Sequence, residues 1–231
     1  MVISMSIMVH SFRQTVIVWI DQTLRADLFV RVAGGRDIDY QHTLPSESVE
    51  KLKYLKSIAA VDQFRALDIT YNELPVVLAT GDFSVLSQYG NLVIKTGPPA
   101  QELANVMVGQ NRAMVSEAFS LKHKVSVGEN IELQTPNGPA QMEVAAIYFD
   151  YSRERGYIIL DRTTFLNYFK ETAINSFVIY LDDKNQLDST RKEILKTLKD
   201  HRLIIRSNSE LKQQVLEVFD KTFAITYSLE I

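Results

Sequence analysis

The sequence predicts a mixed α+β domain in which two β-α-β units share one sheet, with a β-rich insert between them and a helix at each end. Three observations support this prediction. Apolar residues recur at helical spacing at both ends of the chain. Segments of alternating hydrophobicity flank a short amphipathic helix near the start of the chain, and again near its end. Between them, residues 84–173 contain short strand patterns separated by turn signals.

Composition describes an ordinary globular domain. The chain has 231 residues, of which 46% are hydrophobic and 23% charged, so it can bury a sizeable core. Its net charge of −3 argues against a nucleic-acid surface, which requires a basic stripe. Cysteine is absent, which excludes disulfides, zinc–thiolate sites and thiol nucleophiles, and fits an extracytoplasmic bacterial protein.

The first predicted helix covers residues 1–24. Its first nine residues are nearly all apolar, and Phe12, Val16 and Trp19 follow at helical spacing. The apolar run is shorter than the roughly 18–20 residues that cross a bilayer, and it lacks the basic start and cleavage site of a signal peptide. An N-terminal core helix and the end of a membrane helix are both compatible with this pattern.

Residues 25–83 predict a β-α-β-β segment. A strand around Leu28–Val32 ends at two glycines, and a helix begins at Pro45. Two strands, 59–72 and 74–83, follow and are joined by a turn at Asn72-Glu73. The helix is expected to present one apolar face, formed by Val49, Leu52, Leu55 and Ile58.

Residues 84–173 predict a compact β-rich region. Its first part, 84–101, is predicted as a loop broken by Gly97-Pro98-Pro99. Ser116 is a predicted N-cap for a helix that follows a short strand, and Asp161 is predicted to cap another. The clearest signal is a hairpin across residues 131–146, in which Asn137-Gly138 supplies the turn.

Residues 174–207 predict the second β-α-β unit. Its helix, 187–200, is expected to turn one set of leucine and isoleucine side chains inward, namely Leu187, Ile194, Leu195 and Leu198. Ser207 and Glu210 have the spacing of a capping box that opens the final helix, 208–231. Val215, Phe219 and Phe223 repeat the apolar spacing there.

Both end helices become most apolar at the chain terminus, whereas the ends of soluble domains are commonly polar and frayed. We therefore expect a piece of a membrane protein whose end helices lie side by side, because the chain would leave and re-enter one membrane face. Core packing of these helices against each other explains the same residues.

Three stretches carry a family resemblance: SIMVHSFRQTVIVWIDQTLRADLFVR, VSEAFSLKHKVSVGENIELQTPNGPAQMEVAAIY and SNSELKQQVLEVFDKTFAITYSLEI. In order and spacing they resemble the extracytoplasmic core domain of FtsX-like or MacB-like permeases of ABC transporters, over essentially the whole chain. In that family a porter-like α/β subdomain carries an inserted β-rich subdomain, the sabre, between the first two membrane helices.

The resemblance implies a division into five parts. These are an N-terminal stalk helix (1–24), the first half of the porter-like subdomain (25–83), the sabre-like insert (84–173), the second porter-like half (174–207) and a C-terminal stalk helix (208–231). It also implies a non-catalytic domain on the outer side of the inner (plasma) membrane. Such a domain would couple ATP hydrolysis by a separate ABC ATPase to export, extraction or mechanotransmission. Expected partners are a second permease copy or half, a periplasmic adaptor or a lipoprotein.

Candidate functional residues are few. The stalk helices offer coupling residues, namely Phe12, Val16, Trp19, Val215, Phe219 and Phe223. Arg153, Glu154 and Arg155 could contact a partner, or could form a solvated loop with mutually paired charges.

Catalytic, metal and cofactor sites are not expected. The four histidines are scattered without metal-ligand spacing, and the sequence has no Walker motif. A lipid- or lipoprotein-binding module, with an acyl chain held in a groove between the subdomains, is the alternative function. A hydrolase would need a nucleophile–base motif, which the sequence lacks.

Overall fold

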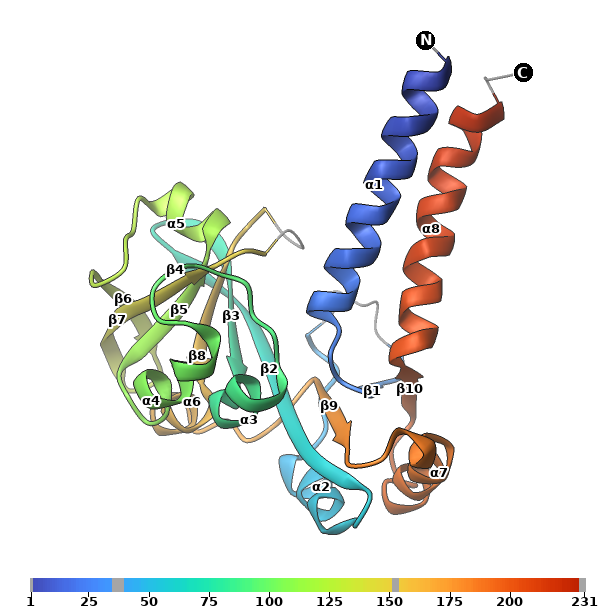
Figure 1. Ribbon diagram of the computed structural model, residues 1–231. Helices are drawn as coiled ribbons and strands as arrows, with labels where there is room; N and C mark the ends of the chain where they lie inside the picture. The colour runs from blue at the N-terminus through green and yellow to red at the C-terminus, as the bar shows by residue number, and fades with distance from the viewer. Residues whose placement is uncertain (1, 35–39, 151–153, 229–231) are drawn as a thin grey trace.

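The computed structural model describes residues 2–34, 40–150 and 154–228 (Figure 1). Its α-helices are α1 (Val2–Thr23), α2 (Ser46–Glu50), α3 (Phe83–Tyr89), α4 (Leu103–Met107), α5 (Glu117–His123), α6 (Arg162–Phe169), α7 (Leu187–Thr197) and α8 (Asn208–Ser228). Its 3-10 turns are η1 (Lys51–Tyr54), η2 (Ala100–Glu102) and η3 (Lys184–Gln186).

The strands form one 10-stranded sheet in the order β10-β1-β9-β2-β3-β8-β5-β7-β4, with β6 paired to β7. They are β1 (Leu28–Val32), β2 (Ile58–Tyr71), β3 (Leu74–Gly81), β4 (Ile94–Thr96), β5 (Arg112–Ser116), β6 (Asn130–Thr135), β7 (Gly138–Tyr148), β8 (Tyr157–Asp161), β9 (Ser176–Leu181) and β10 (Leu203–Ser207). The mixed α+β class predicted from the sequence is confirmed.

One end of the sheet is built from the two β-α-β units. Strands β10, β1, β9 and residues 58–64 of β2 pair antiparallel in that order, and we call them the ferredoxin-like sheet. Helices α2 and α7 cover one of its faces. Their shared core includes Leu28, Val49, Phe177 and Ile194, all 0% exposed.

The other end, the insert sheet, comprises residues 65–71 of β2 together with β3, β8, β5, β7, β4 and β6. Helices α5 and α6 bury Phe119 and Phe165 on one face, and α3 and α4 bury Phe83 and Met107 on the other. The predicted hairpin is confirmed as β6–β7, with Gly138 at a φ of 103° in its turn. Because β3 pairs with β8, it lies in the insert sheet.

Strand β2 belongs to both sheets. Its first seven residues pair with β9 and its last seven pair with β3, without a helix or loop between them. Figure 1 shows it as the long strand that passes from the lower part of the molecule up into the insert. One continuous backbone therefore joins the two halves of the protein.

Three local predictions were wrong. Residues 84–101 are not simply a loop, since they include α3 and β4; the Asp82 carboxylate caps α3 by accepting hydrogen bonds from the Ser84 and Val85 amides. Ile58 lies on β2, because the predicted helix tightens to η1 and ends at Tyr54. Leu195 is 47% exposed, because the neighbouring Ile194 occupies the inward face of α7.

Candidate functional site

Helices α1 and α8 form the most prominent feature of the molecule, and we call them the terminal helix pair. They lie side by side, run in opposite directions and extend away from the ferredoxin-like sheet, so that both described chain ends lie together (Figure 1). They contain 22 and 21 residues, which corresponds to roughly 30 Å each. Within the described part of the chain, no helix is both long and apolar enough to cross a membrane.

An aromatic cluster joins the two helices. The ring centroid of Phe12 on α1 lies 5.5 Å from that of Phe219 and 6.0 Å from that of Phe223, both on α8. The Phe219 and Phe223 centroids are 4.5 Å apart. Phe219 is 8% exposed, whereas Phe12 is 50% exposed. Three residues that the sequence nominated for coupling are thus in mutual contact, with geometry typical of stabilising aromatic pairs.

An ion pair next to this cluster fixes the alignment of the helices. The Arg13 guanidinium donates from Nε and Nη2 to the two carboxylate oxygens of Asp220, at 3.0 and 3.3 Å. These hydrogen bonds lower the pKa of Asp220. The pair is exposed, so its main effect is geometric. Sequence reasoning missed it, because α8 carries several charged residues and nothing in the sequence pairs Asp220 with Arg13.

The base of the helix pair is attached firmly to the ferredoxin-like sheet. The Asn208 side-chain amide, at the start of α8, donates to the carbonyls of Leu24 (2.5 Å) and Ala26 (3.0 Å), which follow α1. The predicted capping box is confirmed, because Ser207 Oγ accepts from the Glu210 amide at 3.2 Å. Glu210 also accepts two hydrogen bonds from Arg191 of α7, which are the main cause of its lowered pKa.

The other nominated residues occupy separate places. Val16 is half-buried on α1, and Val215 is half-buried on α8. Trp19 belongs to α1, but its side chain lies outside the described part of the structure. Arg153 as a whole residue lies outside it. Glu154 is exposed, and the exposed Arg155 has its Nη1 atom 3.9 Å from an Asp68 carboxylate oxygen.

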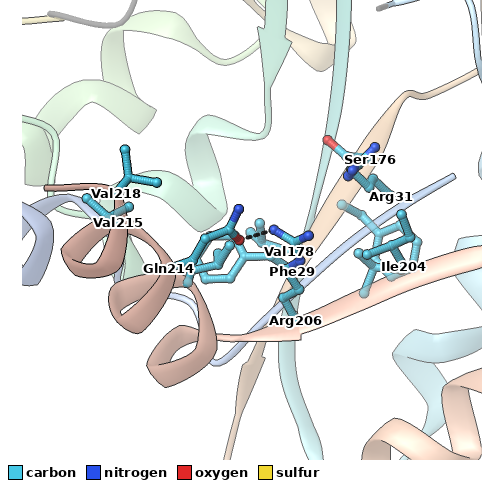
Figure 2. Close-up of a pocket in the computed structure, with 12 residues that line it drawn as sticks. Phe29, Arg31, Ser176, Val178, Ile204, Arg206, Gln214, Val215 and Val218 are labelled. Atoms are coloured by element: carbon cyan, nitrogen blue, oxygen red, sulfur yellow. Dashed lines mark hydrogen bonds between the residues drawn. The ribbon is translucent and has the colours of Figure 1, made fainter. Parts of the chain in front are cut away.

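A cavity of about 470 Å³ lies between α8 and the face of the ferredoxin-like sheet opposite α2 and α7 (Figure 2). Strand register explains its floor, because residues directly opposite in neighbouring antiparallel strands project from the same face. Ser176, Arg31 and Ile204 form one such row across β9, β1 and β10. Val178, Phe29 and Arg206 form the next row.

The junction between the two sheets contains buried polar groups. Asp62 of β2 continues the row of Val178 and accepts a hydrogen bond from the Asp82 amide at 2.9 Å. The pKa of Asp62 is raised to about 7, mainly by burial; the hydrogen bond from the Asp82 amide opposes this rise, and the nearby carboxylates of Asp82 and Asp161 add to it. Asn175 lies close to this junction, where its side chain accepts from the Ala66 amide at 2.8 Å.

Among the described residues, no group of three or more His, Asp or Glu side chains could hold a metal ion. Sequence reasoning missed the cavity and the buried Asp62. The available signal was a single arginine within each of two mostly apolar strands, Arg31 in β1 and Arg206 in β10.

Comparisons with known proteins agree with this architecture. The sequence matches no protein-family model. It is 20% identical over 239 aligned positions to an uncharacterised ABC transporter permease protein of Mycobacterium tuberculosis; the match includes 100% of this chain and 27% of that protein. The chain thus spans about a quarter of the curated relative.

Two solved structures have a similar fold at 14% sequence identity. The periplasmic region of MacB from Actinobacillus actinomycetemcomitans matches with a TM-score of 0.59, over 85% of this chain and 95% of that one. The extracellular domain of the ABC-type transporter YknZ from Gram-positive bacteria matches with a TM-score of 0.56, over 79% and 99%. The resemblance seen in the sequence is thereby confirmed, and the chain has the fold of an FtsX- and MacB-like extracytoplasmic domain of ABC transporter permeases.

Proposed function

We propose that this chain is the extracytoplasmic domain of an ABC transporter permease in the inner (plasma) membrane, and that it couples ATP hydrolysis to work on the outer side. The sequence similarity to one stretch of a longer permease and the fold of the MacB and YknZ domains support this role. The sequence has no Walker motif, so the proposal assigns ATP hydrolysis to a separate ABC ATPase.

The terminal helix pair is the single observation that carries the proposal. Its two helices continue into β1 and β10, which are hydrogen-bonded neighbours in the ferredoxin-like sheet. Asn208 ties the start of α8 to the segment between α1 and β1, and Glu210 ties it to Arg191 of α7. A tilt of the pair, started in the membrane, would therefore be passed to the sheet and along β2 to the insert. Export, extraction and mechanotransmission could all use this movement, against a second permease, an adaptor or a lipoprotein.

The test follows the position of the insert relative to the membrane. Because the chain has no cysteine, Lys122→Cys on α5 provides a single attachment point for a fluorescent donor within this domain, and any cysteine elsewhere in the permease is replaced by serine. The intact permease and its ATPase are reconstituted in liposomes with acceptor-labelled lipids, and energy transfer is compared with ADP and with a non-hydrolysable ATP analogue. We expect transfer from the membrane-anchored protein to change with the nucleotide.

Phe12→Glu and Phe223→Glu are expected to abolish that change, because each replaces an aromatic contact between α1 and α8 with a partly desolvated carboxylate, which weakens the association of the two helices. Tyr54→Glu is the matched control, since this aromatic side chain on η1 is 86% exposed. Circular dichroism of the isolated domain checks that each variant folds. Energy transfer that is identical in both nucleotide states of the unmodified protein would contradict the proposal.

A further inference from the structure

The face of the ferredoxin-like sheet that carries the cavity is only partly covered. On the covered face, Leu28 and Ile179 are 0% exposed beneath α2 and α7. On the opposite face, Phe29, Val178 and Ile204 remain half-buried, although they belong to the same strands. An apolar floor of this kind normally lies under a helix or a ligand, because its exposure to water is unfavourable.

Helix α8 supplies one wall of the cavity but does not fill it. Leu211, Val215 and Val218 recur at i, i+4 and i+7, so they share one face of the helix, which borders the cavity. Val218 is nevertheless 59% exposed. The cavity volume of about 470 Å³ is within the roughly 300–1,000 Å³ of typical small-molecule sites. The space is therefore apolar, accessible and large enough for a ligand.

The charged groups in the cavity have one sign. Of the described residues that line it, the charged ones are Arg31 and Arg206. Arg206 Nη1 donates to Gln214 Oε1 of α8, which holds this guanidinium beside the cavity. Figure 2 shows Val215 and Val218 at one side and Arg31 and Ser176 at the other. The cavity thus combines apolar walls, from both α8 and the sheet, with two guanidinium groups that project from β1 and β10.

We propose that this cavity binds a single-chain anionic amphiphile. Its hydrocarbon chain would lie against Phe29, Val178 and Val215, and its carboxylate or phosphate would be held by Arg31 and Arg206. Guanidinium groups are well suited to both headgroups, with which they form charge-assisted hydrogen bonds. A free fatty acid and a lysophospholipid share this chemistry. The site is independent of ATP coupling, so the ligand site and the proposed function can fail separately.

Such a ligand would contact α8 and the sheet at the same time. It would therefore stabilise the arrangement in which α8 lies over the sheet, because a ligand favours the state to which it binds. Asp62 lies next to Val178 in the same row but is buried beneath Asp82 and does not line the cavity. The headgroup thus meets the arginines rather than this carboxyl.

The first test uses the complete chain with valine and isoleucine methyl groups labelled for NMR. Laurate, dodecyl phosphate, dodecanol and dodecyltrimethylammonium have equal chains and different headgroups. We expect saturable shifts at Val178, Ile204 and Val215 with both anions, and affinities for the neutral and cationic probes at least about tenfold weaker. Preference for laurate would indicate a fatty acid, and preference for dodecyl phosphate would indicate a phospholipid-derived ligand.

Variants then separate headgroup recognition from general adhesion. Arg31→Gln combined with Arg206→Gln should weaken binding of the anions at least about tenfold and leave dodecanol binding unchanged. Arg202→Gln, which removes an exposed arginine outside the cavity, is the matched control. Val218→Trp should block the cavity without disturbing the core, since Val218 is largely exposed. It should reduce binding of all probes.

Three results would overturn the proposal. Equal affinity for the anionic and cationic probes would show that Arg31 and Arg206 do not recognise the headgroup. Shifts confined to residues near the outer end of α1, such as Ile7, would show detergent-like adsorption on the helix pair. Unchanged affinity in both the double arginine variant and Val218→Trp, with folding verified from the NMR spectrum, would exclude the cavity as the site.

Discussion

At the scale of single residues, Asp62 is a buried carboxyl group whose pKa is strongly shifted. It is 8% exposed at the junction of the two sheets, and burial raises its pKa from 3.8 to about 7. Between these values the folded protein keeps a proton that the unfolded chain releases. The free energy of unfolding therefore falls as pH rises through this range, and the loss is complete above pH 7.

Asp62→Asn should remove this penalty. The asparagine side chain keeps an oxygen that can accept the hydrogen bond from the Asp82 amide, but it carries no titrating charge. We expect the variant to be more stable at pH 8 by up to about 4 kcal/mol, and to lose the decline between pH 4 and 7. Urea denaturation at pH 4.5, 6 and 8 measures both effects, with Asp188→Asn on the exposed side of α7 as control. Equal stability of the two variants at pH 8 would show that burial does not raise the pKa of Asp62.

Sequence reasoning predicts a residue's role where the signal is local. Ser116 and Asp161 were identified as helix caps, and both accept amide hydrogen bonds as expected. Asp62 and Asp68 look alike in the sequence, since both are polar residues of β2 separated by an even number of positions. Asp62 is buried and Asp68 is exposed because the junction covers only Asp62. That covering depends on tertiary packing, which the local pattern does not contain.

At the scale of elements, the terminal helix pair depends on a small aromatic contact. Among the described side chains of the pair, Phe219 is the most buried ring, and each helix touches the rest of the protein mainly at its base. The pair should therefore open as a local unit, with the sheets intact.

Phe219→Ala should destabilise the helix pair by about 3 kcal/mol, because it removes a buried ring and both of its aromatic contacts. Hydrogen exchange should accelerate in α1 and α8 and stay unchanged in the ferredoxin-like sheet. Mass spectrometry of peptic fragments measures this. Val218→Ala, one position away and 59% exposed, is the control and should have little effect. Equal acceleration throughout the sheets would mean that the pair does not open separately.

Element prediction succeeded where a pattern was long or carried a cap, as for α8 and the β6–β7 hairpin. It failed at α3, although Asp82 caps this helix, because α3 spans only 7 residues and both Asp82 and Phe83 were assigned to the end of the preceding predicted strand, 74–83. It also failed at Leu195, because adjacent apolar residues on a helix cannot share one face.

At the scale of the whole molecule, the angle between the two sheets is set by buried polar contacts around β2. Arg65 donates to Asn175 Oδ1 and its Nη2 atom lies 2.6 Å from a Glu171 carboxylate oxygen. The Asn175 side chain also donates to the Tyr40 carbonyl at 2.8 Å. These contacts bring the chain before α2, the middle of β2 and the start of β9 together at one point.

Asn175→Ala removes the acceptor of the Ala66 amide and a donor to the Tyr40 carbonyl. We expect it to lower the free energy of unfolding by about 2–3 kcal/mol, because buried polar groups lose their partners. It should also broaden the distribution of angles between the sheets, which small-angle scattering can detect. Asn185→Ala in the exposed turn η3 is the control. An unchanged scattering profile in a clearly destabilised variant would exclude the effect on the angle.

The two β-α-β units of the ferredoxin-like sheet were predictable from the sequence, because each shows strand and helix patterns in the expected succession. The passage of β2 through both sheets was not predictable, since alternation in a strand does not identify its neighbours. The alternative hypothesis placed an acyl-chain groove between the subdomains. The cavity with Phe29 and Val178 lies instead between α8 and the ferredoxin-like sheet. This cavity arises because β9, β1 and β10 pair in this register and α8 lies beside them.

The joining of both terminal helices to one end of the β1–β10 ladder has a mechanical consequence. Leu28 pairs with Ser207 at that end, directly beside the roots of α1 and α8. Moving the helices apart would pull on the β1–β10 ladder from this first pair, so that the hydrogen bonds of the ladder would break one after another. Moving both helices in the same direction would instead move the whole domain without pulling β1 and β10 apart. The domain should therefore resist a joint displacement of the two helices more strongly than their separation. The hydrogen bonds from Asn208 to the Leu24 and Ala26 carbonyls oppose that separation.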